Sequence, residues 1–339
     1  MNLPAEDTDI HDFQQLILLD FNFEAFRVLA NEIGDDKVRE IFKPHMLNSA
    51  MALTINAQKY LGLMIYDIDS MCYVGTFIGR ATWRAPTGKM MLTAKGMEWH
   101  NSEGCFLSGA PVTFRRMICD DATQGFLSAK HDYGYSNSCP ERGDGECGSI
   151  YYNKTDPSID WRNRGGKDTT IPTPNFDNDQ MKEVGILALG ELWLFPTQAL
   201  VEWIGPDAVP KLKEAMRPLG RKWGKELSRV TGKHENDIGA VFSVIDTYNS
   251  IMGQEGRTIY SSSDRHETEI TICPFSVAPT EMGAPCGDAI GAQCEAFCNG
   301  MCEAISPDFE LRFTSKMCAG GQNCHRVIRK KLSARVTRE

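Results

Sequence analysis

The sequence lacks the features that mark several large classes of protein. It has no excess of positive charge: the 339 residues carry a formal net charge of −9, which gives a nucleic-acid-binding role no electrostatic support. It contains no run of about 18 apolar residues, and its first residues, MNLPAEDTDIHDF, lack the basic segment and apolar core of a signal peptide. We therefore expect a cytoplasmic protein that does not cross a membrane.

Short catalytic and binding motifs are also missing. The sequence has no glycine-rich phosphate loop, no HExxH and no GxSxG, which argues against nucleotide-binding, zinc-protease and serine-hydrolase functions. It also lacks the paired CxxC motifs of a zinc ribbon. The composition, with 42% hydrophobic and 24% charged residues, is ordinary for a globular protein and leaves enough chain for two domains.

What the sequence does contain is cysteine. Seven of its twelve cysteines fall within residues 267–330. Without a secretory signal, this content argues for a reducing compartment, where thiols act as ligands, nucleophiles or core residues. Residues 287–305 have helical periodicity, and three cysteines spaced four apart there lie on one helical face. Two more flank a Gly-Gly turn that predicts a hairpin. The seven are Cys273, Cys286, Cys294, Cys298, Cys302, Cys318 and Cys324.

The cysteine cluster has three interpretations. Buried cysteines can fill a packed helix–sheet core. Helix thiols that face a cysteine hairpin could instead bind zinc, which prefers four thiolate or imidazole ligands, and an iron–sulfur cluster is a less favoured variant. The third interpretation is a catalytic thiolate. The predicted metal ligands are Cys298, Cys302, Cys318 and Cys324, and the catalytic candidates are Cys298, Cys318 and Cys324. In both of these interpretations, the sulfurs of the three catalytic candidates meet within about 4 Å of a common point.

The same part of the chain resembles a known family. ICPF at 272–275, EAFC at 295–298 in a predicted helix, and a glycine-rich turn closed by NCHRVI at 323–328 are similar to the L-2-amino-thiazoline-4-carboxylic acid hydrolase family. That family is similar in layout to the 4-vinyl reductase ligand-binding domains. The resemblance covers the C-terminal part of the chain.

This resemblance implies hydrolytic opening of a small cyclic amidine or amide ring, in a substrate that carries a carboxylate. The nucleophile would be an activated cysteine or a metal-bound water. We expect Cys273, His266 and His325 to bind the substrate. The alternatives are a non-catalytic metal-binding module that senses a small molecule, and an iron–sulfur or redox protein. A homodimer is compatible with the sequence.

The two halves of the chain also contain similar motifs in the same order. GAP recurs at 109–111 and 283–285, and the cysteine-flanked hairpin at 139–147 has a counterpart at 318–324. We therefore predict a tandem duplication of one α+β unit, with N-terminal helices packed on a small antiparallel sheet and one helix inserted between strand pairs. The predicted boundaries are residues 1–152 for the first copy, 153–180 for a linker and 181–339 for the second copy.

Overall fold

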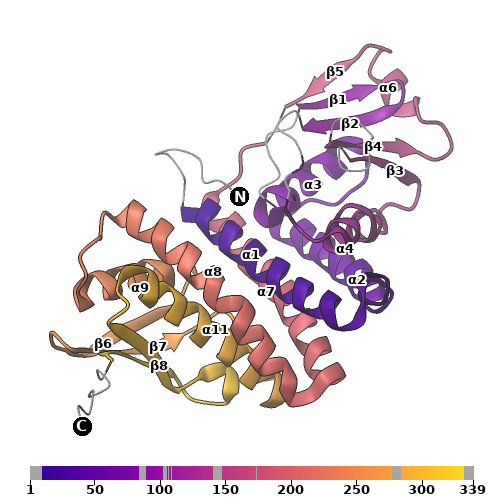
Figure 1. Cartoon of the computed structure of the whole chain (residues 1–339). Helices are drawn as coiled ribbons and strands as arrows, with labels where there is room; N and C mark the ends of the chain where they lie inside the picture. The colour runs from indigo at the N-terminus through magenta and orange to yellow at the C-terminus, as the bar shows by residue number, and fades with distance from the viewer. Residues whose placement is uncertain are drawn as a thin grey trace, which may run out of the picture. The chain divides into compact units, whose positions relative to one another are not determined.

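A computed structural model describes residues 10–83, 89–101, 105, 107, 109–139, 147–172, 174–276 and 284–331 (Figure 1). The chain divides into two compact units. Unit 1 consists of Met1–Gln15 and Ala30–Ala188, and unit 2 of Leu16–Leu29 and Leu189–Glu339. Helices α1 (Ile10–Ile33) and α7 (Asn178–Ile204) therefore each contribute residues to both units. The α+β class predicted from the sequence is confirmed.

Unit 1 holds a sheet in the order β3-β4-β2-β1-β5, in which every neighbouring pair is antiparallel. Its strands are β1 (Lys89–Thr93), β2 (Gly96–Asn101), β3 (Tyr133–Ser138), β4 (Cys147–Asn153) and β5 (Thr169–Ile171). Its helices are α2 (Asp35–Leu61), α3 (Ile68–Trp83), α4 (Val112–Arg116), the π-helical η1 (Met117–Ala122), α5 (Thr123–Leu127) and α6 (Ile159–Asn163).

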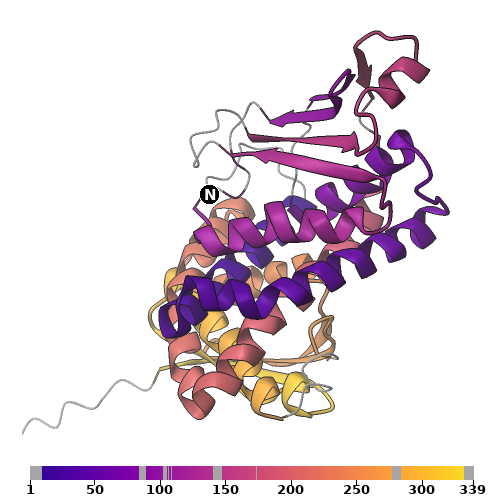
Figure 2. The same ribbon diagram turned by 90° about the vertical axis from the view of Figure 1, so that its right-hand side faces the viewer.

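The continuous helix α4–η1–α5 covers one face of this sheet (Figure 2). Tyr135 on β3 donates a hydrogen bond from its hydroxyl to the carbonyl oxygen of Asp120 at 2.8 Å. On its other side the helix packs against α2, where a Cβ on Gly125 would lie 2.5 Å from the carbonyl oxygen of Leu47. The sheet, this helix and α2 thus form three layers.

Residues 153–180, which we predicted to be a linker, instead contribute α6 and β5 to unit 1. Strand β5 extends the sheet, with Ile171 opposite Met90. The hydroxyl of Tyr133 donates to the carboxylate of Asp160 on α6 at 2.6 Å. The sequence gives no sign of these elements because β5 has three residues and α6 has five, which is too few for a periodic pattern to appear.

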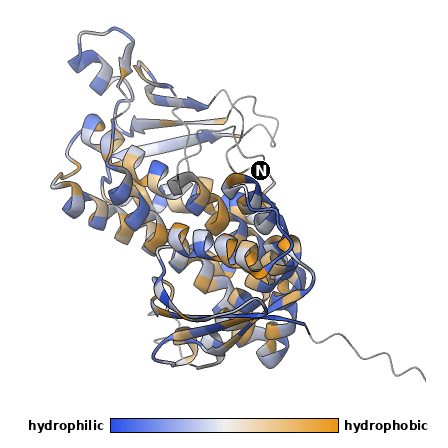
Figure 3. Ribbon diagram, turned by 90° about the vertical axis from the view of Figure 1, so that its left-hand side faces the viewer, coloured by the Kyte–Doolittle hydropathy of each residue, from blue (hydrophilic) through white to orange (hydrophobic). Residues whose placement is uncertain are grey.

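Unit 2 holds a sheet in the order β6-β7-β9-β8, again antiparallel throughout. Its strands are β6 (Glu255–Ser261), β7 (Arg265–Ile272), β8 (Phe309–Ser315) and β9 (Cys324–Lys330). Its remaining helices are η3 (Gly205–Asp207), α8 (Ala208–Thr231), α9 (Ile238–Ile251), α11 (Ala284–Ile305) and η4 (Met317–Ala319). Most of this sheet is coloured as hydrophilic in Figure 3, as expected of a sheet with one solvated face.

One helical stretch among the described residues, Asp179–Thr231, is long and apolar enough to cross a membrane by length and composition alone. Its apolar window is 56% buried inside the protein. The core helix of a soluble protein passes the same test, and Trp193, within this stretch, is only 1% exposed. The absence of a membrane span therefore stays a prediction.

The two units have the same order of elements in their described residues: helices, two strands, a helix and two more strands. When β1–β4 are matched in chain order with β6–β9, the two sheets also have the same strand order, apart from the additional β5. In each unit, the strand that begins with the second hairpin cysteine pairs with the strand before the inserted helix, through Asn101↔Cys147 and Ile270↔Cys324. A duplication would produce this agreement, and the duplication itself stays a prediction.

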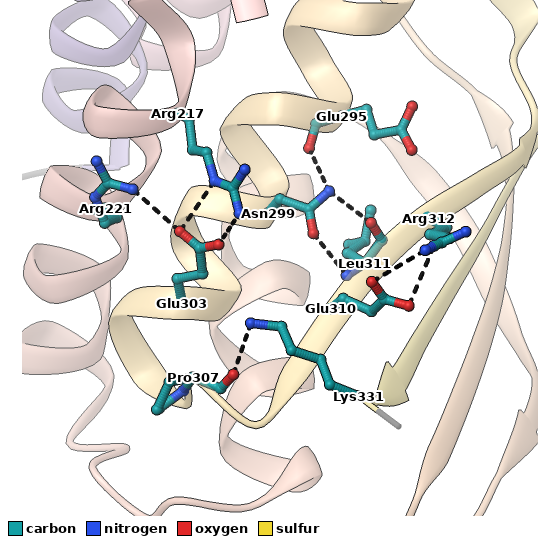
Figure 4. Close-up of polar contacts among 10 residues, drawn as sticks. All are labelled: Arg217, Arg221, Glu295, Asn299, Glu303, Pro307, Glu310, Leu311, Arg312 and Lys331. Atoms are coloured by element: carbon teal, nitrogen blue, oxygen red, sulfur yellow. Dashed lines mark hydrogen bonds and ion pairs between the residues drawn. The ribbon is translucent and has the colours of Figure 1, made fainter. Parts of the chain in front are cut away.

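Helix α11 joins the layers of unit 2 (Figure 4). On one side it meets α8 at very short range, because a Cβ on Gly220 would lie 2.0 Å from the carbonyl oxygen of Phe297. At the exposed margin of this contact, Glu303 accepts hydrogen bonds from Arg217 and Arg221. On the other side, α11 faces the sheet.

Asn299 on α11 binds the backbone of the edge strand β8 (Figure 4). Its amide donates to the carbonyl oxygen of Leu311 at 2.6 Å, and its side-chain oxygen accepts the N–H of Leu311 at 2.9 Å. The helix side chain thereby satisfies backbone groups of β8, which pairs only with β9 among the described strands. This pairing also protects the edge from association with other strands.

We expect Asn299→Leu to lower the free energy of unfolding of unit 2 by about 2 kcal/mol, because it leaves a partly buried N–H and C=O without partners. Urea denaturation followed by tryptophan fluorescence measures the change. The control is Arg312→Ala on the same strand, which removes only an exposed ion pair with Glu310 and should change stability by less than about 1 kcal/mol. Equal effects of the two variants would contradict the role of Asn299.

Candidate functional site

The inner face of the second sheet carries a charged residue at its centre. Strand β9 alternates, so that Cys324, Arg326 and Ile328 share the buried face. Arg326 lies in the middle of a row across three strands, with Thr268 on β7 and Phe313 on β8 as its neighbours. Its side chain therefore projects into the interior of unit 2.

Arg326 is 3% exposed and has no carboxylate partner among the described residues. Its two terminal nitrogens donate to neutral amide oxygens, one to Asn249 and the other to Gln254 at 2.6 Å. The guanidinium carbon lies 5.0 Å from the centre of the Phe313 ring. The Nε–H has no hydrogen-bond partner in the part of the chain that the structure describes.

Such an environment is costly for a guanidinium group. Arginine stays charged in proteins, and a buried charge without a counter-ion costs several kcal/mol even after hydrogen bonding to neutral groups. The amides of Asn249 and Gln254 and the ring of Phe313 compensate for part of this cost. An anion would compensate for the remainder, supplied either by a cysteine thiolate of the chain or by a ligand.

Cysteine side chains lie in the field of this charge. Cys298 on α11 is 1% exposed; burial raises the pKa of its thiol to about 11, and the positive charge of Arg326 opposes that rise. Cys324, two residues from Arg326 on the same face, accepts a hydrogen bond at its sulfur from the N–H of Met317 at 3.2 Å. The fully buried Tyr248 completes the surroundings, and burial holds its pKa well above the usual value.

A comparison with known protein families shows which family this part of the chain resembles. Residues 194–328 match the model of the L-2-amino-thiazoline-4-carboxylic acid hydrolase family. The match lies within unit 2 and includes Arg326, Cys298 and Cys324. No curated protein and no solved structure matches the chain. The resemblance predicted from the sequence is therefore supported for these residues, and the similarity to 4-vinyl reductase domains stays a prediction.

The buried surroundings of the unit 2 cysteines disfavour the thiolate form that a catalytic cysteine needs. Burial raises the pKa of Cys318 to about 12 and that of Cys273 to about 11. Burial also raises the pKa of Cys294 and Cys302 well above the usual value. Burial therefore works against a thiolate at Cys298 and Cys318, because these sulfurs are taken out of water and desolvation disfavours the charged form. The catalytic role of these cysteines stays a prediction.

The expected convergence of Cys298, Cys318 and Cys324 is not found either. No group of three or more His, Cys, Asp or Glu side chains within the described ranges could hold a metal ion. Cys318 lies instead beside the start of α11, its sulfur 3.2 Å from where a Cβ on Gly291 would lie. Gly291 precedes Cys298 by two helical turns, or roughly 10 Å along the axis. The described residues therefore do not fit the predicted zinc site that includes Cys302.

The two histidines that we predicted to bind substrate lie apart from the cysteines. His266 is buried on β7, with its ring nitrogens 3.3 Å from the Thr258 hydroxyl and 3.1 Å from the Ser261 hydroxyl. Its ring packs against Phe242 in a tilted arrangement, with 3.8 Å between ring centres, and burial lowers its pKa. Both ring nitrogens of His266 already have partners, which is typical of a structural histidine.

His325 lies on the opposite face of the sheet from Cys324 and Arg326. Its Nε2 is 3.0 Å from the carboxylate of Glu267, and its Nδ1 contacts the hydroxyl of Thr314. Adjacent residues of a strand point to opposite faces, so His325 and Cys324 cannot act on the same small ligand from this strand. Cys273 follows the end of β7, and the two thiols Cys273 and Cys324 lie close enough to interact electrostatically.

Arg326 was not among the site residues predicted from the sequence, although the sequence contains a signal for it. In the run Cys-His-Arg-Val-Ile, alternation places Arg326 on the face that carries Cys324 and Ile328. At the equivalent position, unit 1 carries an uncharged residue, Ser149. Its ladder pairs Ser149 with Asn137 at the position where unit 2 pairs Arg326 with Phe313. The candidate site is therefore specific to unit 2.

Proposed function

We propose that unit 2 hydrolyses a small cyclic amidine or amide that carries a carboxylate, with L-2-amino-thiazoline-4-carboxylate as the first candidate. The match of residues 194–328 supports the reaction class. The observation that carries the substrate class is Arg326, a buried guanidinium with neutral partners and an unpaired Nε–H. A carboxylate can accept two parallel hydrogen bonds from such a group and neutralise its charge.

The proposed reaction adds one water across the amidine carbon. A C–O bond forms at that carbon, one ring bond breaks, and the departing ring heteroatom takes a proton, which gives a carbamoyl product. Arg326 would hold the carboxylate and so fix the ring relative to the neighbouring thiols, and such positioning is a large part of many rate enhancements. A cysteine could attack the carbon first, or a water could attack directly.

Cysteine variants separate these two routes. Purified protein is incubated with L-2-amino-thiazoline-4-carboxylate, and loss of substrate is followed by chromatography. If a thiol is the nucleophile, Cys298→Ala or Cys324→Ala should lower kcat by about 100-fold or more. The control is Cys302→Ala, which removes a buried thiol one turn further along α11 and should change kcat by only a few-fold.

Each outcome decides between the alternatives. Full activity in Cys298→Ala, Cys318→Ala and Cys324→Ala would exclude a thiol nucleophile and favour direct attack by water. If calorimetry shows that L-2-amino-thiazoline-4-carboxylate binds the wild-type protein but no turnover is seen, the alternative of a non-catalytic sensor is favoured. The buried Arg326 fits this alternative equally well. Absence of both binding and turnover would reject an aminothiazoline carboxylate as the ligand.

We also propose that the two units arose by duplication and that only unit 2 retained the anion site. The agreement of element order and strand order supports this proposal. Ser149 stands at the position of Arg326, and its hydroxyl donates to the side-chain oxygen of Asn137 at 2.6 Å. Because serine is uncharged, unit 1 needs no counter-ion at this position. We therefore expect unit 1 to lack the activity proposed for unit 2.

A further inference from the structure

The C-terminal end of α9 forms a tight turn that contacts Arg326. The N–H of Gln254 donates to the carbonyl oxygen of Asn249 at 2.8 Å, and the N–H of Gly253 donates to that of Ser250 at 3.2 Å. Gly253 has the left-handed conformation, with a φ of 66°. These are the bonds of a Schellman motif, in which a glycine ends a helix and reverses the chain. The motif brings residues 249 and 254 into contact.

The two residues that this turn joins are amides in places where apolar side chains are frequent. In many Schellman motifs the side chains at these two positions make a hydrophobic contact. Asn249 and Gln254 are only 4% and 8% exposed, and each accepts a hydrogen bond from a different terminal nitrogen of Arg326. A guanidinium group can only donate hydrogen bonds, so the amides must present their oxygens to it. The end of α9 is therefore built around the arginine.

Neither amide neutralises the charge of Arg326. An amide oxygen replaces hydrogen bonds to water but carries no net charge, and a helix C-terminus supplies only a partial charge of about −0.5. A carboxylate at either position would instead form an ion pair with the guanidinium. Asparagine and aspartate have nearly the same shape, as do glutamine and glutamate. The presence of amides at both positions thus leaves the positive charge of Arg326 available to an external anion.

A second cation beside Phe313 does not change this balance of charge. The ammonium group of Lys316 lies 5.7 Å from the centre of the Phe313 ring, and the guanidinium carbon of Arg326 lies 5.0 Å from it. Lys316 donates to the carboxylate of Glu295 at 2.8 Å, so this pair has no net charge. One added carboxylate beside Arg326 is therefore expected to neutralise the charge of its surroundings.

We propose that Asn249 and Gln254 are positioning residues that set the charge selectivity of the unit 2 site. They hold the terminal nitrogens of Arg326 through neutral oxygens, so that its charge and its Nε–H are left for the carboxylate of a ligand. A ligand with a neutral group in that place would leave the charge uncompensated and would bind less tightly. The identity of the ligand rests on the proposed function, whereas the uncompensated charge rests only on the hydrogen bonds of Arg326.

The first part of the test measures the stability of the full-length protein. Asn249→Asp and, separately, Gln254→Glu add a negative charge beside Arg326 and should each raise the melting temperature of unit 2 by about 4 °C or more. In the background of Arg326→Met, the same changes should lower it, because the carboxylate then has no counter-ion. The control, Ser250→Asp, adds the charge at an exposed neighbour and should change the melting temperature by less than about 2 °C.

The second part measures binding and turnover. Calorimetry compares L-2-amino-thiazoline-4-carboxylate with its carboxamide, which is neutral at the position of the carboxylate. Wild-type protein should bind the carboxylate at least about 10-fold more tightly than the carboxamide. Asn249→Asp and Gln254→Glu should weaken binding of the carboxylate by about 10-fold or more and leave binding of the carboxamide nearly unchanged. They should also raise KM by a larger factor than they lower kcat.

A rise in melting temperature together with a fall in affinity distinguishes charge selection from a structural role, because loss of a structural contact lowers both. The inference is overturned if neither carboxylate variant raises the melting temperature, or if a stabilised variant binds the carboxylate as tightly as the wild type. If the wild-type protein binds neither compound, the proposed function loses its ligand. The melting temperatures with and without Arg326 then still decide whether the two amides leave its charge uncompensated.

Discussion

Replacing Arg326 with methionine is expected to raise KM for L-2-amino-thiazoline-4-carboxylate by about 10- to 100-fold while unit 2 stays folded. The activity falls because a charge-assisted pair with a carboxylate is worth about 1.5–3 kcal/mol, and each 1.4 kcal/mol is a factor of about ten. The fold survives because methionine removes a buried charge that lacks a counter-ion among the described residues. Replacing buried charges by apolar side chains of similar size is often neutral for stability.

Two further variants sharpen this result. Arg326→Lys keeps the charge but loses the planar pair of donors, so it should recover part of the affinity and little of the orientation. Arg312→Met removes an exposed arginine from the outer face of the same sheet and should leave KM unchanged. KM and kcat come from initial rates, and melting temperatures come from circular dichroism. A large fall in the melting temperature of Arg326→Met with unchanged KM would show that Arg326 is structural.

The sequence predicted the elements of unit 2 better than their contacts. The helix expected over residues 287–305 is present as α11, Ala284–Ile305, and the strands on either side carry the alternation that predicted them. Helical spacing placed Cys294, Cys298 and Cys302 on one face correctly. It could not predict which of these sulfurs the hairpin would meet, because that depends on where along the helix axis η4 docks. Cys318 of the hairpin docks at Gly291, two helical turns before Cys298.

The chemistry of the site was harder to predict for a related reason. Cysteine and histidine attract functional interpretations by residue type, whereas arginine in a strand is normally assumed to face solvent. Alternation along the strand places Arg326 on the same face as Cys324, but only the structure shows that this face is the buried one. Sequence spacing alone does not reveal which face is buried.

The boundaries between units were predicted incorrectly at α1. Residues 16–29 pack with unit 2: Asn22 donates to the carbonyl oxygen of Leu189 at 3.1 Å, and Asp20 accepts from Trp223 at 2.9 Å. The edge of the Phe21 ring meets Phe297 at 4.6 Å between centres. A helical pattern shows that a segment has an apolar face, but it does not identify the partner of that face. Position along the chain was therefore a poor guide.

The largest change in stability is expected from Gly220→Ala on α8. Alanine has a higher helix propensity than glycine, by about 1 kcal/mol, so helix propensity alone predicts a stabilised protein. The packing predicts the opposite. The added Cβ would lie 2.0 Å from the carbonyl oxygen of Phe297 and 3.0 Å from its Cα, and backbone atoms of α11 cannot rotate away as a side chain would. Helices α8 and α11 must separate to accept the methyl group.

We expect Gly220→Ala to lower the free energy of unfolding of unit 2 by about 3–5 kcal/mol, at the upper end of the range for overpacked cores. Separation also loosens the neighbouring contacts, since Gly300 on α11 approaches the carbonyl oxygen of Arg217 from the other helix. The control is Lys225→Ala, an exposed change on the same helix that should alter stability by less than about 0.5 kcal/mol. Fluorescence of the buried Trp193 and Trp223 during urea unfolding reports on unit 2. If Gly220→Ala proves as stable as the wild type or more so, helix propensity outweighs the contact and the close approach of α8 and α11 is not required.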